Sequence, residues 1–248
     1  MPKMIREICK ERGISFTSFS DDWLLDMEKD GKSARVLGYK FSLNDSVASN
    51  IAQDKVAAYE LMNHYDVPVV PHYLIRTKAS EENWRTMPWE EGMVIKPLVG
   101  TSGHGVKRCY LAKEAEAWMD KWGIEAWAVS PFVEIKREVR LVLLDEDVLL
   151  TYEKQPVEID GLKFFNLGKG AVALGYRVAD AEIELAQKAK EALGLRLCAV
   201  DIIELAGGTW QVLEVNDGIM MENYARQSPG NIEVAKRMYA TITSILFP

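Results

Sequence analysis

The segment AVDIIELAGGTWQVLEVN, residues 199–216, has the pattern of a β-hairpin. Two runs rich in β-branched and other apolar residues flank the Gly-Gly pair at 207–208, which favours a two-residue turn between antiparallel strands. With that turn, pairing the strands residue by residue places Asp201 directly opposite Glu214. Because side chains alternate between the two faces of a strand, Asn216 lies on the same face as Glu214. The sequence therefore predicts two carboxylates and an amide side by side at one end of a hairpin.

The predicted carboxylates and amide lie at one end of an apolar surface. On the same predicted face we expect four apolar side chains, Ile203, Leu205, Trp210 and Val212. Two carboxylates that face each other across a strand pair repel, which destabilises the hairpin unless a cation lies between them. Oxygen atoms of carboxylates and amides are ligands that Mg²⁺ prefers, so Asp201, Glu214 and Asn216 predict a magnesium site. Two alternatives stay open: a solvated acidic end of the hairpin, and a register shift of one residue that separates the pair.

A glycine-rich loop follows an apolar strand earlier in the chain. Residues 92–98 (GMVIKPL) lead into residues 100–105 (GTSGHG), where the glycines let backbone N–H groups approach a ligand closely. Lys96, near the end of the strand, adds a positive charge suited to phosphate. The loop lacks the Lys-Ser/Thr that ends a Walker A motif, and its spacing is wrong for a Rossmann turn. It predicts a phosphate-binding loop, with an ordinary flexible turn as the alternative.

A second glycine-flanked loop carries polar residues. Asn166 and Lys169 belong to the stretch NLGKG, residues 166–170. An amide and an ammonium group between glycines suit an anion or a phosphoryl group in transfer. A plain surface loop with the same composition remains the alternative.

A second hairpin carries three charged residues. Its strands are predicted at 138–144 and 148–154, joined by the polar turn at 145–147. That turn places Glu138 opposite Lys154 and Arg140 opposite Tyr152. These residues predict either part of a functional site or a simple cross-strand ion pair.

The rest of the chain contains further predicted helices and strands. Apolar residues recur at helical spacing in five segments, residues 1–13, 54–65, 112–122, 180–193 and 231–246. Additional strands are predicted at 69–75 and 126–133. Residues 14–45 are mixed, with a strand in ISFTSF (14–19) and a short helix in DDWLLDMEKDG (21–31), capped by Asp21 or Asp22. The predicted fold class is α+β, with antiparallel sheets and helices packed on them.

Composition excludes several classes of protein. The 248 residues carry 30 basic and 37 acidic side chains, a net charge of −7, which argues against a general nucleic-acid coat. No apolar run reaches the roughly 18–20 residues that span a bilayer, so we expect no integral membrane protein. The charged stretch at residues 1–13 lacks the apolar core of a secretory signal. Three widely spaced cysteines predict no disulfide framework, and a cytoplasmic location fits these features.

In their order along the chain, these motifs resemble those of the ATP-grasp superfamily. Lys55 before a helix, followed by DVP at 66–68, resembles the first nucleotide lysine of the family and the turn that follows it. VIKP at 94–97 with the loop at 100–105 resembles the second lysine and the flexible phosphate loop. SPFV at 130–133 corresponds to the adenine hinge. The resemblance extends from about Lys55 to Asn216.

The second half of the resemblance points to one group within the superfamily. Asp201 and the sequence EVN at 214–216 resemble the metal-binding strands. Asn166-Leu167 and EVR at 138–140 recur in the group of ribosomal-protein glutamate ligases, glutathione synthetases and cyanophycin synthetases. Pro131 stands where many relatives have a glutamate that contacts the adenine amino group, which leaves the base selectivity open.

The resemblance implies an ATP-grasp fold with two α+β subdomains whose antiparallel sheets hold the nucleotide between them. It implies a ligase that uses ATP and Mg²⁺ to convert a carboxylate into an acyl phosphate, which an amine then attacks to form an amide. The implied substrates are small-molecule carboxylates and amines, such as an amino acid or peptide. Two other classes stay open: a nucleotide-binding regulatory or partner-dependent subunit without ligase activity, and a small-molecule kinase.

Functional residues of the family carry over to matching positions. The implied ATP contacts are Lys55, Lys96, the loop residues Gly100, Thr101, Ser102, Gly103, His104 and Gly105, the hinge residues Ser130, Phe132 and Val133, and Glu138 at the ribose. The implied Mg²⁺ ligands are Asp201, Glu214 and Asn216. The resemblance implies that Arg140, Lys154, Asn166 and Lys169 stabilise the acyl phosphate and the tetrahedral oxyanion that follows.

The chain ahead of Lys55 is short for this family. We therefore expect a short N-terminal segment, residues 1–50, in place of the larger domain that precedes the ATP-grasp domain in relatives. Residues 51–248 are predicted to form the ATP-grasp domain. Within it, residues 51–132 form the subdomain of the lysines and the glycine loop, and residues 133–248 form the metal-binding subdomain. A homodimer or a partner protein would compensate for the short N-terminus.

Overall fold

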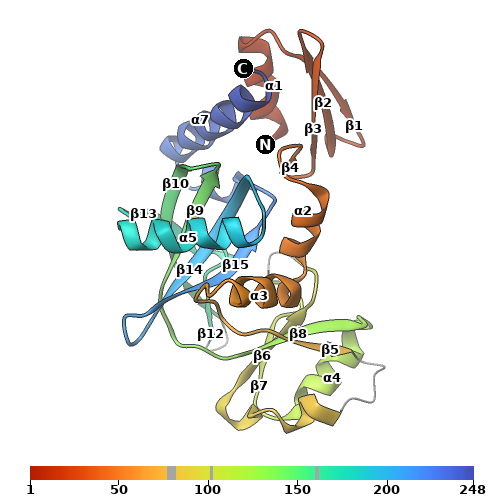
Figure 1. Ribbon diagram of the computed structural model, residues 1–248, viewed down its shortest axis with the longest axis vertical. Coiled ribbons are helices and arrows are strands. Elements are labelled where there is room, and N and C mark those ends of the chain that lie inside the picture. Colours follow the sequence, from red (N-terminus) through yellow and green to blue (C-terminus); the bar gives the residue numbers. More distant parts are fainter. Residues whose placement is uncertain (77–81, 101–102, 160–161) are drawn as a thin grey trace.

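Three larger sheets follow one another along the length of the molecule, each with helices packed against it (Figure 1). The computed structural model describes residues 1–76, 82–100, 103–159 and 162–248. A four-stranded sheet lies at each end and a five-stranded sheet lies between them. The strands within every sheet pair antiparallel, which confirms the predicted α+β class. Within the described ranges, no helix combines the length and apolar character needed to cross a membrane.

The N-terminal unit, residues 1–41, consists of one helix and a four-stranded sheet. Its elements are α1 (Pro2–Glu11), β1 (Ser15–Phe19), β2 (Leu24–Lys29), β3 (Lys32–Leu37) and β4 (Lys40–Phe41), and the strands pair in that order. The helix predicted at 21–31 is wrong. Leu25 and Met27 alternate with more exposed residues along β2 and share a buried cluster with α1. Asp21 and Asp22, with φ of 55° and 64°, form the turn before β2 instead of capping a helix.

Two consecutive helices lead from this unit to the rest of the chain. Helices α2 (Ser46–Gln53) and α3 (Lys55–His64) meet at Asp54. The Asp54 carboxylate accepts hydrogen bonds from the backbone N–H groups of Val56 and Ala57, at 3.0 and 2.9 Å, and so caps α3. The predicted helix at 54–65 is confirmed, and Lys55 is held as its first residue.

The sheet at the far end of the molecule, called the distal sheet below, carries the glycine-rich loop. Its order is β5 (Tyr73–Arg76), β8 (Ala126–Pro131), β6 (Met93–Pro97) and β7 (Lys107–Cys109). Helix α4 (Ala112–Trp122) begins and ends where the sequence predicts, and the short 3-10 helices η1 (Glu82–Thr86) and η2 (Trp89–Glu91) lie nearby. Ile95 and Trp127 from the sheet share one buried cluster with Met119 of α4.

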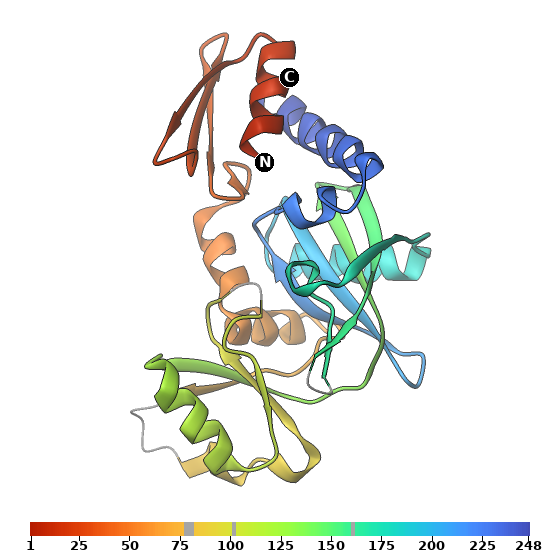
Figure 2. The same ribbon diagram turned by 180° about the vertical axis from the view of Figure 1, so that it is seen from behind.

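The five-stranded central sheet has helices on one face. Its order is β13 (Val172–Gly175), β10 (Asp147–Gln155), β9 (Ile135–Leu144), β14 (Leu197–Leu205) and β15 (Trp210–Asn216). Helix α5 (Asp180–Ala192) covers one face, where Leu141 and Val200 of the sheet pack with Ala186 of the helix (Figure 1). The segment of β11 (Val157–Ile159), β12 (Leu162–Phe164) and η3 (Leu167–Lys169) lies over the other face, in front of the sheet in Figure 2.

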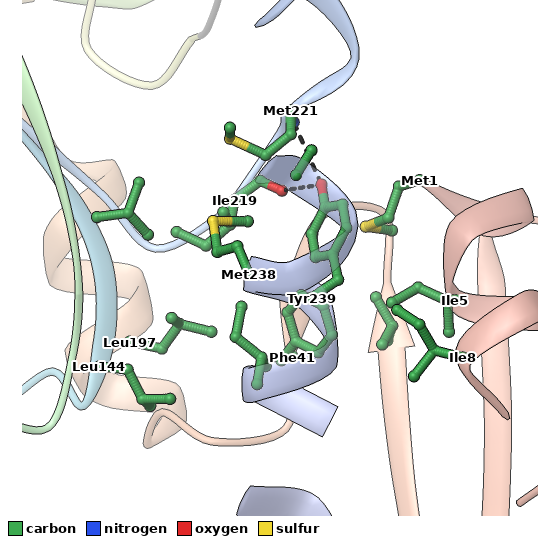
Figure 3. Packing of buried hydrophobic residues seen from close by; sticks show 14 of the residues in the cluster. Met1, Ile5, Ile8, Phe41, Leu144, Leu197, Ile219, Met221, Met238 and Tyr239 are labelled. Atoms are coloured by element: carbon green, nitrogen blue, oxygen red, sulfur yellow. Dashed lines mark hydrogen bonds between the residues drawn. The ribbon is translucent and has the colours of Figure 1, made fainter. Parts of the chain in front are cut away.

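The last segment of the chain returns to the first. Helix α6 (Glu222–Ala225) is followed by α7 (Pro229–Leu246), which lies beside α1 (Figure 1). One buried cluster joins Ile5 of α1, Phe41 of β4 and Tyr239 of α7 with Leu144 of the central sheet (Figure 3). The N-terminal unit therefore shares its hydrophobic core with α7 and with one end of the central sheet.

Tyr239 also fixes the segment that follows β15. Its hydroxyl donates to the Ile219 carbonyl at 2.9 Å and accepts from the Met221 N–H at 3.2 Å (Figure 3). Tyr239→Phe should lower the free energy of unfolding by about 1–3 kcal/mol, because it leaves two buried backbone groups without a partner. Urea unfolding measures this loss. Tyr65→Phe, which changes an exposed ring, serves as the control, and equal stability of the two variants would contradict the expectation.

Both hairpins of the central sheet have a turn that differs by one residue from the prediction, followed by a β-bulge; the first turn is one residue shorter than predicted. In the first hairpin, Leu144 pairs with Asp147. The register then shifts at Leu149, and this bulge restores the predicted pairing of Arg140 with Tyr152. The polar end of the hairpin is thus as predicted, although the turn is not.

The second hairpin also has a bulge, but its turn is one residue longer than predicted, since the Leu205 N–H donates to the Thr209 carbonyl across residues 206–208. Glu204 pairs with Trp210 near the turn, and a bulge at Leu213 restores the predicted pairing of Asp201 with Glu214. The expectation that Trp210 and Val212 continue the face of Asp201 is wrong. They pair with Glu204 and Ile202, whose side chains point to the opposite face of the sheet.

Candidate active site

Four side chains form a row across the central sheet, on the face opposite α5. Tyr152 pairs with Arg140, Arg140 with Asp201, and Asp201 with Glu214, so β10, β9, β14 and β15 each contribute one residue. Residues that face each other on neighbouring strands project from the same side of a sheet. The two bulges therefore determine which side chains meet in this row.

The Asp201 carboxylate is held by two cations. Arg140 donates from Nε to Oδ1 at 2.7 Å and from Nη2 to Oδ2 at 2.6 Å, a bidentate contact. Lys154 Nζ lies 2.8 Å from Asp201 Oδ1 and donates to Glu138 Oε1 at 2.6 Å. The Lys154 and Glu138 side chains each expose only 6% of their surface. The predicted ion pair between Glu138 and Lys154 is confirmed, and it belongs to a buried network of four charges.

The network shifts the pKa values of its two acids, Asp201 and Glu138, in opposite directions. Burial acts to raise the pKa of Asp201, but Arg140 and Lys154 outweigh it and lower that pKa to about 2. For Glu138 burial is the larger effect, and its pKa is raised although Lys154 opposes the shift. Both cations stay charged, since the pKa values of Arg140 and Lys154 are raised by the adjacent acids against the effect of burial.

The three predicted metal ligands lie on adjacent strands. Asp201 faces Glu214, and Asn216 lies two residues farther along β15 on the same face. Among the described residues, no group of three or more His, Cys, Asp and Glu side chains could hold a metal, so any such site here needs the Asn216 amide. In that same part of the chain, Asn216 makes no side-chain hydrogen bond, and Asp201 Oδ2 accepts only from Arg140. The oxygen atoms present therefore fit Mg²⁺.

The two predicted phosphate lysines come from different elements and lie near the same carboxylate. Lys55 Nζ donates to the Gly100 carbonyl at 3.0 Å and lies 4.0 Å from Glu214 Oε1. Lys96, on β6, has its pKa lowered to about 8 by burial and by Lys55, against the opposing effects of Glu214 and Glu138. The structure therefore brings charged groups of the distal and central sheets together.

The glycine-rich loop is fixed at its C-terminal end. Gly105 has φ of 72°, and its carbonyl accepts a hydrogen bond from Trp118 Nε1 at 2.8 Å. A Cβ at Gly105 would lie 2.9 Å from Pro97 Cγ, so only glycine fits without a shift of the proline. His104 is exposed. The predicted loop residues Thr101 and Ser102 lie outside the described residues.

The NLGKG loop contacts the glycine-rich loop. Lys169 Nζ donates to the Gly103 carbonyl at 3.2 Å and lies 4.1 Å from the centre of the Phe164 ring. Asn166 Oδ1 accepts from the Gly168 N–H at 2.7 Å, so this oxygen caps η3. The structure thus gives Asn166 a local structural contact and places Lys169 against the predicted phosphate loop.

The predicted adenine hinge connects β8 to β9. Ser130 is buried and Val133 is half-buried. The Phe132 N–H donates to the Gly92 carbonyl at 2.9 Å, and the Arg108 guanidinium lies 3.4 Å from the centre of the Phe132 ring. The Phe132 backbone N–H is therefore used within the protein, and its ring is covered on one side by Arg108.

His72 is a buried residue of this region that the sequence analysis missed. Its Nδ1 lies 2.8 Å from the Val70 carbonyl, and its Nε2 is buried without a partner in the described part of the chain. Burial and the nearby Lys96 lower its pKa to about 3, so the ring is neutral. Together with Lys55 and Glu214 it lines a small internal cavity. His72 is a single histidine in the short apolar segment predicted as a strand at 69–75. No periodic pattern there would have identified it as a residue of the site.

Comparison with known proteins places the chain among ATP-dependent ligases. Residues 52–242 match the family described as RimK-like ATP-grasp domain. The probable alpha-L-glutamate ligase of Klebsiella pneumoniae (strain 342) is 26% identical over 206 residues, which cover 82% of this chain and 67% of the relative. The ribosomal protein bS6–L-glutamate ligase of Escherichia coli O7:K1 (strain IAI39 / ExPEC) is 26% identical over 202 residues, covering 80% and 66%. The chain thus spans about two thirds of the length of these relatives.

A solved structure shares the fold. D-alanine–D-alanine ligase from Bacillus anthracis superposes with a TM-score of 0.61 at 13% sequence identity, covering 82% of this chain and 71% of that chain. This likeness concerns the fold and not the substrates. It agrees with the predicted ATP-grasp architecture of antiparallel sheets.

Proposed function

Because the chain belongs to the RimK-like ATP-grasp family of carboxylate–amine ligases, we propose that it uses ATP to join a carboxylate to the amine of an amino acid or peptide. Family members form an acyl phosphate first, and the amine then displaces phosphate to give the amide. The observation that carries this proposal is the convergence of Lys55 of α3, Lys96 of the distal sheet and Glu214 of the central sheet, beside the network around Asp201.

We propose that ATP binds between the distal and central sheets, with Lys55 and Lys96 at its phosphates. The 3.0 Å contact between Lys55 and the Gly100 carbonyl places this lysine at the start of the glycine-rich loop. Ser130 and Val133 keep their predicted roles at the adenine, and Phe132 packs nearby. Glu138 Oε1 is paired with Lys154, so Oε2 is the oxygen that would accept from a ribose hydroxyl.

The proposed Mg²⁺ ligands are Asp201, Glu214 and Asn216. When bound, Mg²⁺ would neutralise charge on the phosphate oxygens. Arg140 and Lys154 are held by the Asp201 carboxylate, so their positive charges are fixed before any substrate arrives. Such preorganised charge stabilises the negative oxygens that develop during phosphoryl and acyl transfer. Lys169 adds a further charge beside the glycine-rich loop, and the Asn166 NH₂ group is a donor on the same loop.

The names of the relatives support a choice of first substrates. Two relatives are named as glutamate ligases, and one name specifies ribosomal protein bS6. We propose L-glutamate as the first amine substrate to test and a small molecule or peptide as the carboxylate. We propose no nucleic acid and no membrane as a binding partner of this protein. A cytoplasmic location and a homodimer or partner protein remain predictions of the sequence.

We propose the domain division predicted from the sequence, whose first boundary, 50/51, falls within α2 (Ser46–Gln53). The predicted boundary at 132/133 falls in the short connection between β8 of the distal sheet and β9 of the central sheet. Residues 1–41 form a folded unit ahead of α2, so the predicted N-terminal segment has a sheet of its own. We propose that the ATP-grasp domain begins near residue 51, close to the start of the family match at residue 52.

ADP release in the presence of Mg²⁺ and ATP tests the proposed activity. The assay pairs each of the common L-amino acids, as amine, with a panel of carboxylates and short peptides, and mass spectrometry identifies the product. We expect ADP and phosphate in equal amounts with an amide product, only when carboxylate and amine are both present. A phosphorylated product formed without any amine would show a kinase instead. Nucleotide binding without turnover under every combination would favour a regulatory subunit.

The buried Lys96 makes ATP use dependent on pH. Because its pKa is lowered to about 8 by burial, Lys96 loses its charge above that pH. The apparent KM for ATP should therefore rise above pH 8, by up to about tenfold per pH unit for one required proton. Initial rates across this range measure the change. Lys96→Arg keeps its charge at high pH and should remove this rise, so an equal rise in both proteins would contradict the assignment.

A further inference from the structure

The segment that follows α3 runs along the outer edge of β15 and brings His72 to the candidate active site. The Val212 N–H donates to the Pro68 carbonyl at 2.8 Å, and the Val70 N–H donates to the Val212 carbonyl at 3.0 Å. These bonds join the two segments in parallel. His72 lies two residues beyond Val70, and Glu214 lies two residues beyond Val212. The parallel pairing therefore places the histidine level with this carboxylate.

The contact with Val70 determines which nitrogen of His72 carries the proton. His72 is 3% exposed, and burial and Lys96 lower its pKa to about 3, so the ring is neutral and has a single N–H. Nδ1 lies 2.8 Å from the Val70 carbonyl, which can only accept, so the proton is on Nδ1. Nε2 is then an acceptor, and it is buried without a donor in the described part of the chain. Because an unpaired buried acceptor is costly, we expect a donor at Nε2.

The cavity that His72 lines has the size and the polar groups for that donor to be a water molecule. It offers about 10 Å³ of space for the centre of a water molecule, which is enough for one. Lys55 and Glu214 also line it, and their Nζ and Oε1 atoms lie 4.0 Å apart, too far for a direct hydrogen bond. Polar groups at this separation are suited to a bridging water.

Lys55 has one donor left for such a water. Its Nζ donates to the Leu98 carbonyl at 3.5 Å and to the Gly100 carbonyl at 3.0 Å. An ammonium group has three N–H bonds, so one remains. The cavity is therefore lined by one acceptor nitrogen, one carboxylate and one ammonium group with a free N–H.

We propose that one buried water joins His72 to Glu214 and Lys55, and that His72 thereby positions Glu214, a proposed Mg²⁺ ligand. The water donates one hydrogen to His72 Nε2 and the other to a Glu214 oxygen, and it accepts from Lys55 Nζ. Such a water fixes one carboxylate oxygen and leaves the other for the metal. Partners of this kind orient metal ligands without touching the metal. The inference rests on the proposed nucleotide and metal site and adds a positioning residue to it.

Two amide side chains separate the roles of the two ring nitrogens. His72→Asn keeps a donor near the place of Nδ1, toward the Val70 carbonyl, and lacks an acceptor at the place of Nε2. His72→Gln carries its amide oxygen near the place of Nε2 and so keeps an acceptor for the water. The matched control is His64→Asn, which removes an exposed histidine from α3.

Calorimetric titration with a non-hydrolysable ATP analogue and Mg²⁺ measures the effect on binding. His72→Asn should bind the analogue roughly 10-fold more weakly than the wild type, because Glu214 loses its orientation. His72→Gln should restore most of the affinity, and His64→Asn should bind as the wild type does. The loss in His72→Asn should be smaller when Mg²⁺ is omitted, since Glu214 acts through the metal. A merely structural role would weaken binding equally with and without Mg²⁺ and in both variants.

Two measurements on the protein without ligands test the water itself. Nitrogen-15 NMR should show the neutral His72 ring with its proton on Nδ1, the His72 signal being the one that is missing from His72→Asn. A high-resolution crystal structure should show one water within hydrogen-bond distance of His72 Nε2 and Glu214. A proton on Nε2, a cavity without water, wild-type binding by His72→Asn, or an equal loss in His72→Asn and His72→Gln would each overturn the inference.

The role of His72 and the proposed ligase activity fail separately. The binding, NMR and crystallographic measurements need no turnover. A protein that binds the analogue with the expected pattern but yields no amide would contradict the ligase activity alone. If the wild type does not bind the analogue, the proposed nucleotide site and the role of His72 are both wrong.

Discussion

Glu214→Gln should lower Mg²⁺-dependent turnover by about 100-fold or more while leaving the protein folded. Glutamine keeps the shape of the side chain but removes the negative charge that the proposed metal site requires. It also weakens the attraction that holds Lys55, 4.0 Å away, near the site. Steady-state ADP release at several Mg²⁺ concentrations measures the effect, and the Mg²⁺ requirement should shift to higher concentration.

Stability provides the discriminating control for this variant. Glu214 faces Asp201 across the strand pair, so removing its charge relieves a repulsion and should not destabilise the fold. The midpoint temperature of thermal unfolding, measured without ligands, should therefore be unchanged or slightly raised. Glu184→Gln, on the exposed surface of α5, should leave both turnover and stability unchanged. If Glu214→Gln turns over at the wild-type rate at limiting Mg²⁺, the assignment of Glu214 as a Mg²⁺ ligand is wrong.

Lys154→Met should destabilise the protein by about 3–5 kcal/mol, the second large effect that we expect. Lys154 neutralises Glu138 at 2.6 Å and shares Asp201 with Arg140, all within a buried part of the sheet. Without it, Glu138 is left as a buried acid with no cation in contact. Urea unfolding gives the free energy, and activity should fall as well.

A double substitution separates the lost ion pair from the lost packing. Glu138→Leu combined with Lys154→Met removes both charges, and Asp201 keeps its bidentate partner Arg140. The double variant should regain much of the stability that Lys154→Met loses, because no charge is left buried alone. Lys188→Met removes an exposed lysine paired with Glu184 and should leave stability nearly unchanged, because water screens exposed ion pairs. A loss below 1 kcal/mol for Lys154→Met would contradict the assigned role.

Much of the candidate site was predictable because it depends on alternation along strands. Turn residues located both hairpins, and counting from each turn gave the pairing of Asp201 with Glu214 and of Arg140 with Tyr152. These pairings are correct, but counting residues from the turn did not predict the bulges that produce them. The first turn is one residue shorter than predicted and the second is one residue longer, and in each hairpin a bulge of one residue compensates.

Local irregularities of the hairpins, and features that depend on distant parts of the chain, were not predictable. Between each turn and its bulge, counting residues from the turn gives the wrong cross-strand pairs. Trp210 and Val212 were therefore assigned to the wrong face of the sheet. The aspartates at 21 and 22 predicted the cap of a short helix at 21–31, but Leu25 and Met27 lie in a strand and pack in the cluster that includes α1 and α7. His72 and the cavity that it lines with Glu214 depend on packing between segments far apart in the sequence.

The cluster around Tyr239 has a consequence for the order in which the molecule is made. Strands β1 to β4 and α1 leave the ribosome early, yet the buried cluster they share also includes α7, which is synthesised near the end of the chain. Contacts between such distant segments form slowly, because a long loop must close first. The part of this cluster that packs against α7 is therefore exposed until the end of synthesis, and chaperones that bind apolar surfaces would meet it there.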